Sequence, residues 1–182
     1  MLASIVYITA FIYLVLGISA FSLNKKGTIN RLFLLLTGIL AFWSFTYSVS
    51  LAAHTAEESI TWRCLSVFGW GIFYSVFLHL SLVLTKNRAL NKPISYILIY
   101  LPAVVNVILY APFGILGAKQ YEMLLGEFGW VNIKPANIGG HLLNLYYVLF
   151  GLISFALIIR WLGTIQSNAF LKPDALKFKI SF

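Results

Sequence analysis

Five long apolar stretches, separated by short polar segments, dominate the pattern of hydrophobic and polar positions along this 182-residue chain. A helix needs about 20 mostly apolar residues to cross a bilayer, and each stretch reaches roughly that length. The five stretches cover residues 2–23, 32–53, 66–85, 94–115 and 140–162. The pattern therefore predicts an all-α fold, a polytopic transmembrane helix bundle with about five spans.

The composition excludes an ordinary soluble domain. Hydrophobic residues make up 60% of the chain and charged residues only 10%, with a mean hydropathy of +0.90. Soluble domains carry about 25% charged residues. Because so few charges cannot cover a globule whose apolar stretches recur along its whole length, we expect the lipid bilayer to cover much of the surface.

The first apolar stretch is predicted to be a retained span and not a cleaved signal peptide. It lacks the basic segment with which a signal peptide begins. It is followed directly by Asn24, Lys25 and Lys26, which provide the positive flank of a span. Residues 2–23 are therefore expected to form the first transmembrane helix.

Basic residues alternate in number between successive loops, and this alternation predicts the orientation of the bundle. Ten of the 13 Lys and Arg residues fall in the first loop, the third loop and the C-terminal segment. Because loops rich in Lys and Arg stay in the cytoplasm, we expect the N-terminus outside and the C-terminus inside the cell. Basic residues distributed in this way orient a membrane protein, so no nucleic-acid partner is expected.

The segments outside the apolar stretches suggest two regions. Residues 1–165 are expected to form the transmembrane bundle, and residues 166–182 a basic cytoplasmic tail that links to a missing span or output domain. The longest connection, residues 116–138, contains glycines among aromatic residues. It is predicted to be an ordered extracytoplasmic cap.

Polar and aromatic side chains inside the spans are the candidates for ligand binding, because hydrocarbon contains no water to satisfy them. On the last span, His141, Asn144 and Tyr147 recur at helical spacing and are expected to face the bundle. Packing alone could also explain such residues, since small and polar side chains hold membrane helices together. A ligand cavity in the outer half and simple packing therefore both stay open. The candidate set is Trp43, Tyr47, Trp70, Tyr74, Asn106, Tyr110, His141, Asn144 and Tyr147.

Two further residues are candidates for transmitting a signal through the membrane. Pro102 should bend its helix and open space beside Asn106, because proline removes a backbone donor and its ring clashes with the preceding turn. His79 lies between leucines in the third predicted span, where its imidazole must be neutral or partnered. It could sense protons or lock two helices together, or it could simply be a satisfied interhelical donor.

The sequence offers little support for catalysis. It contains no nucleophile elbow, Walker A loop, HExxH motif or Gly-rich nucleotide loop, and no Asp or Glu lies within a predicted span. Neither the single cysteine, Cys64, nor the three histidines, which fall at different depths, predict a metal site. No enzyme activity, cofactor or metal is expected, and a transporter coupled to protons or cations is disfavoured because it usually needs a buried carboxylate.

Several short motifs, in a fixed order, resemble those of a known family. They are Asn30-Arg31-Leu32-Phe33, Trp43, Trp62-Arg63, Gly69-Trp70, Leu78-His79, Tyr100-Leu101-Pro102 and Gly129-Trp130. Over residues 24–182 the chain resembles the N-terminal seven-transmembrane sensor region of bacterial and archaeal histidine kinases. The resemblance implies a multi-pass protein of a prokaryotic plasma membrane that is joined to a cytoplasmic histidine kinase or another signalling output.

The resemblance and the residues together predict a membrane sensor that perceives a small or membrane-derived signal and transmits it to the cytoplasm. In that family further spans follow the fifth, whereas this sequence stops at Phe182, so we expect either a fragment or a truncated relative. A homodimer is one oligomeric state that the sequence leaves open. The alternative function is a small oligomeric transporter or exporter subunit, which would require a continuous polar path through the membrane.

Overall fold

The computed structural model describes residues 2–135 and 138–171, and the side chains of 166–171 are not considered. The described elements follow one another as α1 (Leu2–Leu23), α2 (Thr28–Ala52), α3 (Ala56–Leu65), α4 (Val67–Leu84), η1 (Arg88–Asn91), α5 (Pro93–Tyr110), η2 (Ala118–Gln120), β1 (Met123–Gly126), β2 (Gly129–Asn132) and α6 (Ile138–Leu171). The predicted tail falls mostly outside the described residues.

Five described segments are long and apolar enough to cross a membrane. They are α1, α2, the nearly continuous pair α3 and α4, α5, and the part of α6 that extends to Ile165. The all-α class and the five predicted spans are therefore confirmed.

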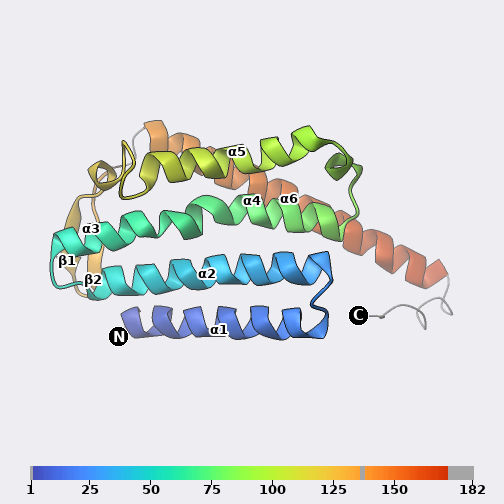
Figure 1. The fold of residues 1–182 in the computed structure, drawn as a ribbon, viewed down its shortest axis with the longest axis horizontal. Coiled ribbons are helices and arrows are strands. Elements are labelled where there is room, and N and C mark those ends of the chain that lie inside the picture. Colours follow the sequence, from blue (N-terminus) through green and yellow to red (C-terminus); the bar gives the residue numbers. More distant parts are fainter. Residues whose placement is uncertain (1, 136–137, 172–182) are drawn as a thin grey trace.

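The long helices lie roughly side by side, with α4 at the centre of the bundle (Figure 1). Helix α1 packs on α2, and α2 packs on α4, which also contacts α5 and α6. The loops between α1 and α2 and between α4 and α5 lie at the same end as the C-terminal part of α6 (Figure 1). We call this the basic end, and we call the opposite end, where β1 and β2 lie, the hairpin end.

Small residues allow the helices of the first half to approach closely, as is common in membrane bundles. A side chain at Gly17 on α1 would collide with the Thr37 hydroxyl on α2. A Cβ at Gly69 on α4 would come within 2.9 Å of the Trp43 Cα on α2. The Ser48 hydroxyl adds a hydrogen bond of 2.9 Å to the Ala3 carbonyl of α1.

The third span was predicted to begin at residue 66, after a loop. In the structure, helix α3 (Ala56–Leu65) occupies most of that loop segment. Thr55 caps α3, since its hydroxyl accepts the Glu58 N–H at 3.1 Å, and Glu58 in turn accepts the His54 N–H at 2.9 Å. This reciprocal cap resembles the capping box, a signal visible in the sequence. The chain bends only briefly at Ser66 before α4 continues.

The bounds of the last two spans also differ from the prediction. Helix α5 ends at Tyr110 and not at residue 115, because Ala111 precedes Pro112 and adopts an extended conformation, as residues before proline usually do. Helix α6 continues to Leu171, nine residues beyond the predicted bound of 162. Its backbone therefore reaches into the predicted tail.

The cap predicted for residues 116–138 contains an antiparallel hairpin that the sequence did not reveal. Strands β1 and β2 pair with Gly126 opposite Gly129. Gly129 has φ +114°, and a side chain there would collide with the Leu51 carbonyl at the end of α2. The hairpin therefore docks directly on the last turn of α2.

Replacement of Gly69 by alanine should lower the free energy of unfolding by about 1 to 3 kcal/mol, because the added methyl group overpacks the contact with Trp43. Gly38→Ala is the matched control, since nothing lies within 4 Å of its added Cβ. That variant should be neutral or slightly stabilising. Thermal unfolding of the purified chain in detergent, followed by circular dichroism, measures both, and equal effects would contradict the close α2–α4 contact.

Candidate functional site

An aromatic cluster fills the space between α4, α5 and α6 toward the hairpin end. The ring centroids of Trp70 and Tyr110 lie 5.7 Å apart, and those of Trp70 and Tyr147 lie 6.3 Å apart. Tyr74 stacks on Tyr147 at 4.7 Å, and Tyr146 continues the cluster at 5.4 Å from Tyr147. Helices α4, α5 and α6 thus bring four predicted site residues into a continuous series of ring contacts.

Tyr110 is the unusual member of this cluster. Only 2% of the residue is exposed, and it shares a buried cluster with Val67 of α4, against which Trp70 of α4 and Leu143 of α6 also pack. Its hydroxyl is buried and has no hydrogen-bond partner among the described residues. A buried hydroxyl without a partner costs roughly 1 to 3 kcal/mol, so this group can bind a polar atom that enters the cluster.

A second group of contacts joins α4, α5 and α6 deeper in the bundle. The Ser75 hydroxyl donates to the Ile99 carbonyl at 2.6 Å. Tyr146 Oη accepts the Ser75 backbone N–H at 3.1 Å and lies 2.9 Å from Ser75 Oγ. Because the Ser75 proton is directed to Ile99, the Tyr146 hydroxyl can donate to Ser75 Oγ or, at 3.5 Å, to the Gly71 carbonyl. We call these three residues the Ser75 junction.

The Ser75 junction lies in the turn of α5 that precedes Pro102, next to the Leu98 carbonyl whose helical donor Pro102 lacks. Pro102 lies inside α5, one turn after Ile99, and lacks the N–H of a normal helical residue. Carbonyls in the turn before a transmembrane proline accept bonds from Ser or Thr side chains of neighbouring helices. The Ser75 hydroxyl fills this role, and the bend predicted at Pro102 stays a prediction.

Asn106 faces the protein interior, but the space expected beside it is occupied. The residue is only 7% exposed, and its Nδ2 donates to the Gly71 carbonyl at 3.3 Å. A Cβ at Gly71 would lie 3.3 Å from the Asn106 Cβ. The backbone of α4 therefore packs directly against Asn106, which serves as an interhelical donor on this side.

His79 connects α4 to α5 nearer the basic end. Its Nδ1 lies 2.8 Å from the Tyr100 hydroxyl, and its ring packs edge-on against Tyr96 at 5.5 Å. Either atom of the His79–Tyr100 pair can donate, depending on the imidazole tautomer. The contact ties the histidine to the helix that contains Pro102.

At the hairpin end, Arg63 of α3 joins three elements. Its Nε donates to Ser50 Oγ of α2 at 3.0 Å, and Nη2 donates to the Trp130 carbonyl of β2 at 3.1 Å. The guanidinium carbon also lies 4.0 Å from the centre of the Tyr47 ring, a cation–π contact. Neutral acceptors and an aromatic face thus hold this cation, and they lock the hairpin to α2 and α3.

Tyr121, which precedes the hairpin, extends this contact network. Its hydroxyl donates to the Arg63 carbonyl at 3.3 Å. Burial raises the pKa of the Tyr121 phenol well above its usual range, with the nearby Cys64 adding to the effect and the Arg63 charge opposing it. The phenol therefore stays protonated near neutral pH and remains a hydrogen-bond donor.

Trp43 and Tyr47 do not join the aromatic cluster. They line a separate cavity of about 200 Å³ between α1 and α2, together with Val6, Tyr13 and Ser44. The predicted set of ligand-binding residues therefore divides between two places on opposite sides of α2 and α4.

The expectation that the whole polar stripe of α6 faces the bundle is wrong for its first two members. His141 and Asn144 are exposed, whereas Tyr147 is half-buried and Gly151 and Ser154 are buried. Successive steps of three residues each turn back by about 60° around a helix with 3.6 residues per turn. His141 consequently lies roughly 120° around the helix from Tyr147, and it faces away from α4.

Sequence reasoning missed Ser75, Tyr100, Tyr146 and Arg63, although each makes a contact between elements. Tyr146 was overlooked because its neighbour Tyr147 fits the polar stripe better. Among the described residues, no three His, Cys, Asp or Glu side chains lie close enough together to hold a metal ion.

The apolar helices and their internally satisfied polar contacts define a polytopic membrane protein with a buried aromatic cluster. The profile of the N-terminal 7TM region of histidine kinase matches residues 5–172, so the chain belongs to that family. This family is a membrane sensor region of a histidine kinase, and such regions are generally non-catalytic. The resemblance found in the sequence motifs is confirmed. No curated protein and no solved structure matches the chain.

Ser75→Ala should lower the free energy of unfolding by about 1 kcal/mol, because it removes the interhelical bond to Ile99 and leaves Tyr146 with only the more distant Gly71 carbonyl as acceptor. Ser81→Ala is the control on the same helix, since Ser81 is equally buried but bonds only to the Phe77 carbonyl of its own helix. Equilibrium unfolding in mixed micelles compares the two. Equal losses would contradict the special role of the Ser75 junction.

Proposed function

We propose that this chain is the signal-perceiving membrane part of a prokaryotic sensor that controls a cytoplasmic histidine kinase or a similar output. Family membership supports the sensor class. The signal would be a small or membrane-derived molecule that binds within the bundle. Residues 1–165 would form the sensor bundle, and the segment from 166 onward would lead to the output.

The unpartnered Tyr110 hydroxyl is the observation that carries the proposal for signal binding. It lies among aromatic rings that provide a large apolar surface, so the favoured ligand has an apolar body and one polar atom. Trp70, Tyr74 and Tyr147 would contact that body. Asn106 would shape the wall next to Gly71, whereas the exposed His141 and Asn144 would contact a ligand only as it enters.

The route to the other end of the bundle follows the contacts between helices. A ligand that separates Tyr110 from Trp70 would shift α5 against α4, and the Ser75 junction and the His79–Tyr100 bond span that same interface. Pro102 lies along α5 between Tyr110 and these two contacts, and it would allow the helix to move as two parts. A signal changes an equilibrium only if it binds the two states differently, so one of these contacts must differ between states.

The interior nearer the basic end favours a receptor over a transporter. Leu78, Leu82 and Ile99 pack there into an apolar core with Phe150 and Leu157. A transported polar substrate would need a continuous polar path, which this packing interrupts.

A kinase assay tests the proposal. In a chain that bears a histidine kinase output, Tyr110→Phe should fold at least as stably as the parent, because it removes an unpaired buried hydroxyl. It should nevertheless lose most of the change in autophosphorylation that a total lipid extract of the host produces in reconstituted vesicles. Tyr7→Phe, on the exposed face of α1, is the control.

The same assay separates the roles of His79. His79→Gln keeps hydrogen-bonding capacity without titrating near neutral pH, whereas His79→Leu removes the bond to Tyr100. If the bond transmits the signal, only the leucine variant should lose the response. Parent-like responses in Tyr110→Phe and in both His79 variants would overturn the assigned binding and transmission residues.

The orientation is a separate proposal, supported by the distribution of basic residues. We expect the hairpin end outside the cell and the basic end in the cytoplasm. A cysteine introduced at Gln120 should react with a membrane-impermeant maleimide in intact cells, and one introduced at Lys92 should react only after lysis. Labelling of the position at 92 in intact cells would reverse the topology.

A further inference from the structure

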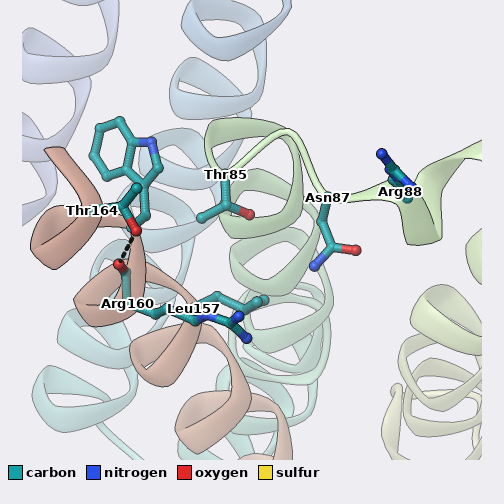
Figure 2. A pocket seen from close by; sticks show the side chains of 7 residues that line it. Thr85, Asn87, Arg88, Leu157, Arg160 and Thr164 are labelled. Carbon is teal, nitrogen blue, oxygen red and sulfur yellow. Dashed lines mark hydrogen bonds between the residues drawn. The ribbon is translucent and has the colours of Figure 1, made fainter. Parts of the chain in front are cut away.

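A cavity of about 450 Å³ opens at the basic end between α4, η1 and the C-terminal half of α6. Its walls include Asn87, Arg88, Leu157, Arg160 and Trp161. Figure 2 shows Arg160 reaching from α6 toward the end of α4, with Asn87 and then Arg88 on the other side. The cavity lies far along the bundle from the aromatic cluster, and nothing in the proposed function uses it.

The polar groups of this cavity are mainly hydrogen-bond donors. Neither the Arg88 nor the Arg160 guanidinium forms a hydrogen bond or ion pair with another described residue. Asn87 Oδ1 accepts the Ala89 N–H at 2.9 Å, so the N–H groups of the Asn87 side-chain amide can donate elsewhere. Such a set of donors fits a ligand that is rich in acceptors and negatively charged.

No acidic side chain among the described residues lies in the segments that form this end. The described carboxylates, Glu57, Glu58, Glu122 and Glu127, all belong to α3 or to the hairpin region at the opposite end of the bundle. The two arginines therefore have no internal counter-ion within the described chain. A bound anion would supply the missing counter-charge.

The position of the cavity along α6 indicates what kind of anion it meets. Arg160 is the first charged residue of α6, after 22 uncharged residues from Ile138, and Trp161 follows it directly. A first charge followed by an indole marks the depth at which a span leaves hydrocarbon and enters the headgroup layer. Leu157, one turn earlier, supplies an apolar wall at the depth of the acyl chains.

We propose that this cavity binds the phosphate of an anionic phospholipid, with Arg88 and Arg160 as its two charge partners. Arginine is suited to phosphate because its planar guanidinium can donate two parallel bonds. The headgroup would connect the loop after α4 to the C-terminal half of α6. Free phosphate groups share the same chemistry, and the experiment includes them as a separate arm.

The test uses the full chain in detergent with an equal mixture of phosphatidylglycerol and phosphatidylcholine, and native mass spectrometry counts the retained lipids. The parent should retain phosphatidylglycerol preferentially. Because each interfacial arginine contributes roughly a five-fold gain in anionic-lipid affinity, Arg88→Gln/Arg160→Gln should abolish most of that preference. Line broadening of the ³¹P signal of inorganic phosphate tests the soluble source in the same proteins.

The control variant is Lys25→Gln/Lys26→Gln, which removes the same charge from exposed positions at the same end but outside the cavity. It should retain the parent's preference for phosphatidylglycerol, and circular dichroism should show equal helicity in all three proteins. Equal losses in both double variants would reduce the effect to general surface charge and overturn the proposal. If the protein binds inorganic phosphate but shows no preference for phosphatidylglycerol, the cavity does not bind a lipid phosphate and the proposal is wrong.

Discussion

The need to satisfy polar groups without water governs this structure, because its five long helices are apolar enough to cross a membrane. Helix α4 meets this need for α5 and for α6, whose Tyr146 hydroxyl bonds to Ser75. Its Ser75 hydroxyl supplies the donor for the Ile99 carbonyl before Pro102, and its Gly71 carbonyl accepts the Asn106 amide. Close contact at Gly69 adds α2 to the same helix. Helix α4 is therefore the element on which α2, α5 and α6 all pack.

The two ends of the bundle differ in how their polar groups are balanced. At the hairpin end, Arg63 finds two neutral acceptors and the Tyr47 ring, so this cation is held within the described chain. Just inside it, the Tyr110 hydroxyl lacks a partner among the described residues. At the basic end, Arg88 and Arg160 border an open cavity. The Arg88 and Arg160 side chains are exposed, whereas the Tyr110 hydroxyl is enclosed within the aromatic cluster.

The differences between prediction and structure arise where local chemistry competes with hydropathy. The span over 94–115 ends early because Pro112 forces Ala111 into an extended conformation, although the residues that follow stay apolar. The loop before the third span is helical because Thr55 and Glu58 cap it. The hairpin escaped prediction because its four-residue strands are too short for an alternating pattern to stand out. It depends on the contact between Gly129 and the end of α2, which are far apart in sequence.

The number of spans, the all-α class and the family could be determined from the sequence, because apolar length is a local property and the family motifs are contiguous. Part of the candidate site was also predictable, since Trp70, Tyr74, Tyr110 and Tyr147 do meet. Only the tertiary structure decided which side of each helix is buried. The crossing of α6 over α4 turns Tyr146 inward and leaves His141 and Asn144 exposed. Helical spacing defines a stripe, but the neighbouring helix and its crossing direction select which part of that stripe is covered.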